Sequence, residues 1–258
     1  EILELYEQPL EKLVEISSEI TEKNFNNKMD FCSLISAKTG KCGENCKYCA
    51  QSSHYRTEIE THPLVTVEEV KNAALNARDN GVTRFAIVTS GRTPDKEDFP
   101  TMLKMIEAIQ SIDGLTSCAS IGILNEQEVR QLRDAGLIRY HHNINTCRSY
   151  YPDVCTTHTY EDRINTVNLV QQYGMELCCG VILGMGETRR QRAEMALELK
   201  EINPDSVPLN FLYPIQGTPF ENYMDKIDEK EILKTIAVLR IVLPETSLRY
   251  AGGRVIRL

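Results

Sequence analysis

Short apolar runs rich in β-forming residues alternate along this chain with segments of helical periodicity. Seven runs predict strands, and between them apolar residues recur every three or four positions, as on one face of a helix. The strands are predicted at 31–37, 83–91, 116–122, 137–145, 175–184, 206–214 and 246–253, and the helices at 9–24, 67–79, 99–111, 125–135, 160–173, 188–201 and 228–242. Strict alternation of this kind predicts an α/β fold with a parallel sheet, as a barrel or as a doubly wound sheet.

Local signals indicate where several of these helices begin and end. Thr66 with Glu69, and Asn125 with Glu128, have the spacing of a capping box at a helix start. Glycine is favoured just beyond a helix end, where the backbone turns left-handed. Three helices are expected to stop in this way, at Gly81, Gly136 and Gly174.

Length and composition favour one domain. The chain has 258 residues, close to the roughly 250 of a typical α/β barrel. We expect a single barrel domain over 1–258, with residues 1–24 as an N-terminal helical extension. The chain ends after the seventh predicted strand, so the last βα unit of an eight-fold barrel is expected to be missing. No apolar run approaches membrane-spanning length, and a net charge of −8 without a basic patch argues against nucleic acid as a partner.

Nine cysteines are a high count for a chain of this size. A secreted protein would pair its cysteines, and nine leaves one over. The simpler interpretation is a cytoplasmic protein with several thiolates bound to metal. The alternative is that most of them are small buried hydrophobic residues.

Residues 42–49 carry the strongest chemical signal, CGENCKYC. Cys42, Cys46 and Cys49 could hold three irons of a 4Fe-4S cluster and leave the fourth iron without a protein ligand. An open iron can bind S-adenosylmethionine (SAM) through its amino and carboxylate groups, and an electron can then release a 5′-deoxyadenosyl radical. Zinc is the competing interpretation, but it favours four closed ligands, and no fourth Cys or His lies close in sequence.

The region around this loop resembles the biotin synthase family. The similarity is most detailed over 32–55 and continues through 141–145, 156–163, 182–188 and 206–212. It covers about residues 25–254, and Tyr48 matches the aromatic residue usual in radical SAM loops. The resemblance implies a radical SAM barrel, sulfur insertion into dethiobiotin, a homodimer, and an electron donor such as flavodoxin or ferredoxin.

A second group of candidate ligands lies on alternate predicted strands. Cys32, Cys118, Cys178 and Arg249 are on the first, third, fifth and seventh strands. In a barrel, one interior layer takes its side chains from alternate strands, so these four could meet inside. This is why we prefer a barrel to an open sheet.

The resemblance gives this layer a role. In the biotin synthase family the interior holds an auxiliary iron–sulfur cluster, usually bound by three cysteines and one arginine. Cys118, Cys178 and Arg249 match three of these ligands, but the remaining cysteine is Ala86 here. We hypothesise that Cys32 replaces it in a variant site, which could hold a 2Fe-2S cluster or a larger cluster rich in sulfide.

The resemblance also implies contacts to SAM and substrate at the carboxyl ends of the strands. Asn143 matches a residue near both, and Asn145 replaces an aspartate that contacts the ribose. Arg163 matches the partner of the SAM carboxylate, and Asn210 matches a residue near the substrate ring, where an amide can both donate and accept.

The remaining cysteines and histidines carry weaker signals. Cys179 should point away from the interior and pack in the core. Cys147 and Cys155, in the loop after the fourth strand, could be free thiols or assist sulfur delivery. His141 and His142 alternate faces, and neither is a confident ligand.

Two other functions fit the cysteine loop. One is a related radical SAM enzyme, such as a hydrogenase-cofactor maturase or an amino-acid mutase. The other is a non-catalytic iron–sulfur or metal-binding scaffold.

Overall fold

One curled parallel sheet organises the molecule. The computed structural model describes residues 1–26 and 29–257. The strands follow the order β1, β2, β3, β4, then β5 and β6 beside β7, with β8 on the other side of β7. Among the described strands β1 and β8 do not pair, so the barrel is open between them. The strands are β1 Cys32–Lys38, β2 Arg84–Thr89, β3 Thr116–Ser120, β4 Arg139–His141, β5 Glu176–Cys178, β6 Val181–Leu183, β7 Ser206–Phe211 and β8 Ser247–Tyr250.

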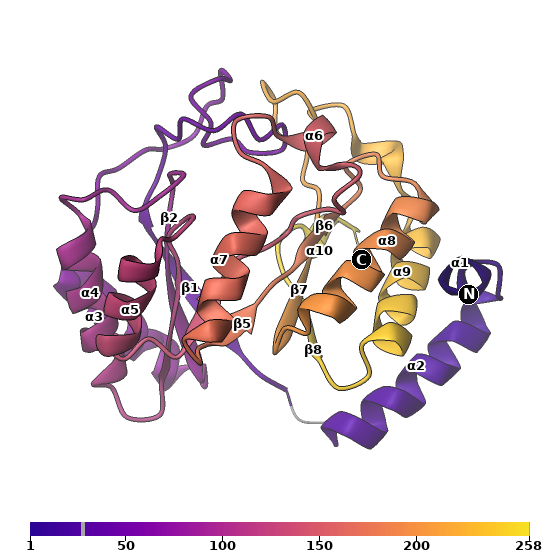
Figure 1. Ribbon diagram of the computed structural model, residues 1–258, viewed down its shortest axis with the longest axis horizontal. Helices are drawn as coiled ribbons and strands as arrows, with labels where there is room; N and C mark the ends of the chain where they lie inside the picture. The colour runs from indigo at the N-terminus through magenta and orange to yellow at the C-terminus, as the bar shows by residue number, and fades with distance from the viewer. Residues whose placement is uncertain (27–28, 258) are drawn as a thin grey trace.

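Helices cover the outer face of the sheet, as Figure 1 shows. Both predicted capping boxes form, at Thr66 with Glu69 and at Asn125 with Glu128. The three glycines expected at helix ends all have positive φ. The covering helices are α3 Val67–Asp79, α4 Phe99–Gln110, α5 Glu126–Asp134, α7 Tyr160–Gln172, α8 Arg189–Ile202 and α9 Glu229–Val242. The predicted alternation of strands and helices is therefore confirmed.

The N-terminal helices α1 Ile2–Tyr6 and α2 Leu10–Phe25 pack against α8 and α9 (Figure 1). Tyr6 and Leu13 are buried there against Val238. The ammonium of Lys234 donates to the backbone oxygens of Tyr6 at 2.6 Å and Gln8 at 2.8 Å. Buried apolar contact and charge-assisted hydrogen bonds thus attach this extension to the barrel. The short elements α1, α6 Tyr151–Val154, η1 Met224–Lys226 and α10 Arg254–Arg257 were not predicted.

The fifth predicted strand is interrupted. Residues 175–184 form β5 and β6 with a break at Cys179 and Gly180. A Cβ on Gly180 would lie 2.1 Å from the backbone oxygen of Pro208 on β7. Only glycine allows the two backbones to approach this closely. At this break the Gly180 N–H donates to the Asn143 side chain, and its oxygen accepts from the Asn145 N–H.

The fourth strand is shorter than predicted, because β4 ends at His141. Asn143 and Asn145 therefore lie beyond it, and Asn145 is left-handed with φ of 66°. Strand alternation therefore does not decide where these two side chains lie, although both line the same cavity. In the part of the chain that the structure describes, no helix is long and apolar enough to cross a membrane.

Candidate functional site

A cavity of about 480 Å³ opens at the carboxyl ends of the strands. Its wall includes the end of β2, the end of β3, the segment after β4 and the end of β7. The residues predicted to bind the cluster, SAM and substrate at this end all line it: Cys42, Cys46, Tyr48, Cys49, Asn143, Asn145, Arg163 and Asn210. Active sites of α/β barrels lie at this end, where loops from several strands meet.

The cysteine loop is closed by its own backbone. The Cys42 N–H donates to the Gln51 oxygen at 3.0 Å, and the Ser53 N–H donates to the Cys42 oxygen at 2.7 Å. Within the loop, the Cys49 N–H donates to the Cys46 oxygen at 3.0 Å. The Ser52 hydroxyl adds a bond to the Glu44 oxygen at 2.6 Å, so backbone and side chain together hold the loop whose three thiols line the cavity.

The three loop thiols do not surround a single point. Among the described residues, two groups of thiols and imidazoles have ligand atoms all within 4.8 Å of one another: Cys32, Cys118 and His141, and Cys46, Cys155 and His158. The loop trio is not such a group. A single zinc ion needs its ligands gathered around one point, whereas a cubic cluster binds each thiolate to a different iron. The spacing therefore suits a cluster better than zinc.

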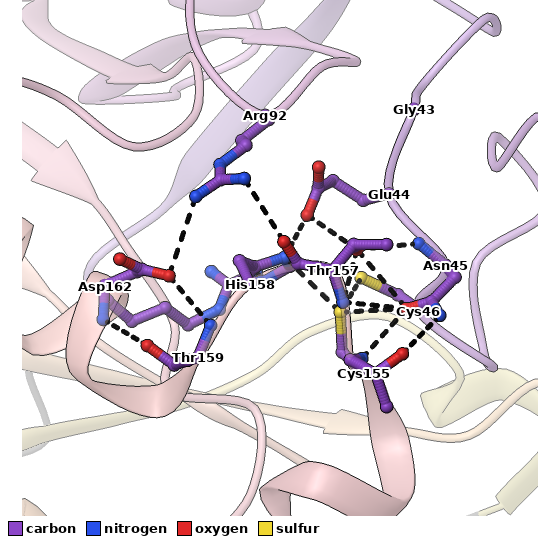
Figure 2. A network of polar contacts seen from close by, with 12 residues as sticks. Gly43, Glu44, Asn45, Cys46, Arg92, Cys155, Thr157, His158, Thr159 and Asp162 are labelled. Carbon is purple, nitrogen blue, oxygen red and sulfur yellow. Dashed lines mark hydrogen bonds and ion pairs between the residues drawn. The ribbon is translucent and has the colours of Figure 1, made fainter.

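Cys46 has a neighbour that sequence reasoning did not place (Figure 2). The sulfur atoms of Cys46 and Cys155 are 3.6 Å apart, although 109 residues separate them. Cys155 also lies 3.3 Å from Nδ1 of His158, which contacts the Glu44 carboxylate. Asn45 joins the same network by accepting from the Thr157 and Thr156 N–H groups. The loop is thus fastened to the segment after β4.

Cys147 and Cys179 are both packed inside the protein. Cys147 is buried, and its sulfur lies 3.5 Å from Oγ of Ser149. Cys179 is fully buried in the main hydrophobic core, and burial raises its pKa to about 12. The prediction that Cys179 is a core residue is confirmed.

Arg163 extends from α7 into the cavity, and only some of its guanidinium N–H groups form hydrogen bonds with the protein. Its Nε donates to Tyr151 Oη at 2.5 Å, Nη1 to the Asn143 oxygen at 3.1 Å, and Nη2 to His158 Nε2 at 3.0 Å. A guanidinium has five N–H donors, so two are unused among the described residues. These two suit a carboxylate in the cavity.

The asparagines are held by the backbone and by Tyr48. Asn145 donates to Tyr48 Oη at 2.9 Å, and Asn143 accepts from the Gly180 N–H at 2.9 Å. Asn210 donates to the Val181 oxygen at 3.2 Å and accepts from the Gly252 N–H at 3.1 Å. Each amide of Asn143 and Asn210 keeps further donor and acceptor capacity for a polar ring in the cavity.

The second predicted group converges within the barrel. Arg249 donates from Nη2 to the Cys178 sulfur at 3.0 Å, and Cys32 contacts both Cys118 and Arg249. Ala86 pairs in register with Cys118 and is fully buried. Its methyl side chain has no atom that could bind a metal in this layer. The structure therefore brings Cys32, Cys118, Cys178 and Arg249 together.

Charged side chains surround this group. Arg84 and Arg139 pair with Asp30 and Glu176 at 2.7–3.3 Å. Contact with the Cys118 thiol, and then the nearby Arg249 charge, lower the pKa of Cys32 to about 6. A thiolate is the form that binds iron, and this environment favours it at Cys32, whereas contact with Cys32 and burial raise the pKa of Cys118.

The two histidines after Tyr140 have different surroundings. His141 lies beside Cys32 and Cys118, and its buried Nε2 has no hydrogen-bond partner in the described part of the chain. Burial first, and then Arg249, lower the pKa of His141 to about 3. His142 stacks on Tyr140, with ring centres 6.0 Å apart, and its Nε2 also has no partner among the described residues.

Comparisons with known proteins agree with this geometry. Residues 37–199 match the model of the radical SAM superfamily, and residues 208–257 match the biotin and thiamin synthesis associated domain. The chain belongs to the radical SAM superfamily. It is 47% identical over 244 residues to the biotin synthase of Acetivibrio thermocellus, covering 95% of this chain and 76% of that one. It is 43% identical over 242 residues to that of Clostridioides difficile, covering 94% and 74%. Within the superfamily, the chain belongs to the biotin synthase family.

Solved structures share the fold at low identity. Methylornithine synthase superposes with a TM-score of 0.84 at 20% identity, over 96% of this chain and 73% of that one. The FeFe-hydrogenase maturase HydG of Carboxydothermus hydrogenoformans gives 0.82 at 20%, over 96% and 60%. These similarities confirm the radical SAM barrel fold and do not distinguish among its reactions.

Proposed function

We propose that this chain inserts sulfur into dethiobiotin to form biotin, with SAM as the source of the radical. Cys42, Cys46 and Cys49 hold a 4Fe-4S cluster, and Cys32, Cys118, Cys178 and Arg249 hold an auxiliary iron–sulfur cluster. When bound, the 4Fe-4S cluster would supply the electron that cleaves SAM, and the auxiliary cluster would supply the sulfur atom.

The residues of the cavity position and shield the reactants. Arg163 grips the SAM carboxylate with its two unused N–H groups. Asn145, held by Tyr48, faces the ribose, and Asn143 and Asn210 orient the ureido ring. Holding the reacting carbon close to the radical source, away from water, is the main task of the protein.

One observation carries the proposal. The cysteine loop and the amide side chains line a single cavity, and His141 in the wall of this cavity reaches Cys32 and Cys118 of the second group. A related maturase or mutase would share the cysteine loop but not the layer around Arg249, and a metal scaffold would not require the amides. The 47% identity to a biotin synthase favours the same choice.

We further propose a cytoplasmic homodimer that receives electrons from a flavodoxin or a ferredoxin, with no membrane or nucleic acid among its partners. Residues 1–258 would form one domain, with 1–24 as an extension on α8 and α9. The continuous sheet and the shared cavity support this division.

The test uses anaerobically reconstituted protein with SAM, dithionite and dethiobiotin. We expect 5′-deoxyadenosine release that depends on dethiobiotin, together with biotin. SAM cleavage indifferent to dethiobiotin would favour another radical SAM reaction. No cleavage by fully loaded protein would favour a non-catalytic scaffold.

The role of Cys32 has its own test. Cys32→Ser should lower the iron and sulfide retained per chain, while Cys147→Ser, which alters another buried thiol, should not. Unchanged iron and sulfide in Cys32→Ser would contradict its assignment as a ligand.

A further inference from the structure

The auxiliary site contains one more potential donor than the sequence suggested. With Ala86 in the register position beside Cys118, the four predicted ligands are Cys32, Cys118, Cys178 and Arg249. His141, at the end of β4, lies among them and pairs in register with Cys178. Its ligand nitrogen and the sulfurs of Cys32 and Cys118 are all within 4.8 Å of one another.

One nitrogen of the His141 ring, the buried Nε2, has no hydrogen-bond partner among the described residues. Burying a polar atom without a hydrogen-bond partner is energetically unfavourable, so such atoms are uncommon in folded proteins. A histidine serving only as core packing would be expected to donate or accept somewhere, as His158 does with Arg163 and Glu44.

The ring lies among charged side chains. The guanidinium groups of Arg84, Arg139 and Arg249 are all near it. Asp30 and Glu176 are the carboxylates of the same network, and they are engaged by Arg84 and Arg139. A neutral imidazole retains one nitrogen lone pair for a metal, and histidine replaces cysteine on iron in some iron–sulfur proteins.

We propose that His141 is an iron ligand of the auxiliary cluster, acting with Cys32 and Cys118 where the thiol at position 86 is absent. This inference rests on the proposed function, since it assumes that the auxiliary cluster forms. It assigns to β4 a ligand that the usual set of three cysteines and one arginine lacks.

The test separates the two clusters before looking for nitrogen. Changing Cys42, Cys46 and Cys49 to alanine removes the ligands in the cysteine loop and leaves the auxiliary site. This variant, labelled with ¹⁵N-histidine and loaded with iron and sulfide, is reduced with dithionite and studied by pulsed EPR. Iron K-edge X-ray absorption, whose imidazole scattering does not depend on spin state, is measured on the same samples.

We expect the signature of a directly bound histidine nitrogen. His141→Ala should abolish it, whereas His142→Ala, the same change at the neighbouring buried histidine, should keep it. His141→Cys controls for loss of the whole cluster in the alanine variant. A thiolate at this position should retain the iron, while the nitrogen signal should disappear.

The possible failures can be told apart. Absence of any auxiliary iron in the triple variant and in the wild-type chain would remove the proposed function itself. A cluster that forms without histidine nitrogen on iron would overturn only the role of His141. A nitrogen signal that survives His141→Ala would do the same.

Discussion

Replacing Arg163 with lysine tests the binding of SAM most directly. Three of its N–H groups are committed to Tyr151, Asn143 and His158, and two remain for the SAM carboxylate. Lysine keeps the positive charge but cannot present two parallel donors. Losing one charge-assisted hydrogen bond costs about 1.5–3 kcal/mol, which corresponds to SAM binding weakened roughly 10- to 150-fold.

The assay is equilibrium binding of SAM to reconstituted protein, together with KM and kcat for 5′-deoxyadenosine release. We expect Kd and KM to rise and iron content to stay at the wild-type value. Arg130→Lys is the matched control, because Arg130 lies on the exposed face of α5, outside the cavity. An Arg163→Lys affinity within about threefold of wild type, less than 0.7 kcal/mol by the same conversion, would refute this reasoning.

Other predictions concern stability, pH and thiol chemistry. Gly180→Ala should lower the free energy of unfolding by about 1–3 kcal/mol, because its Cβ would meet the Pro208 oxygen; thermal unfolding that matches wild type would contradict this. Burial holds the pKa of His142 well below 6.5 in the folded chain. Below pH 6.5 the unfolded chain therefore binds one more proton than the folded chain at this residue. The free energy of unfolding should fall by about 1.4 kcal/mol for each unit by which the pH is lowered below 6.5. In urea titrations, His142→Asn should reduce this dependence on pH. In cluster-free protein treated with oxidised glutathione, Cys46 and Cys155, with sulfurs 3.6 Å apart, should form a disulfide, detectable by peptide mass spectrometry; disulfides confined to the cysteine loop would argue against it.

The sequence predicted the elements of this fold well where their causes are local. Helix starts at Thr66 and Asn125 depend on residues three positions away, and both capping boxes form. The break at Gly180 could not be predicted in this way, because its steric cause is Pro208 on another strand. The end of β4 at His141 likewise depends on neighbouring strands, not on its own apolar run.

For the site as well, features with local causes could be predicted from the sequence and long-range contacts could not. The loop spacing and the family resemblance located the cysteines and Arg163, but not what they touch. The contact between Cys46 and Cys155 joins residues 109 positions apart, and no local sequence pattern predicts it. For His141, strand alternation suggested that one of two histidines points inward, and only the packed structure showed which of them meets Cys32 and Cys118.

The interruption at Gly180 also bears on how the chain can vary over evolution. Its N–H donates to the Asn143 side chain, and its oxygen accepts from the Asn145 N–H, while Cys178 lies two residues before it. One short stretch of main chain therefore spans from the asparagines of the cavity to a thiol of the inner layer. Because these links run through the main chain, substitutions in the outer helices can accumulate while the cavity and the inner layer stay joined at this point.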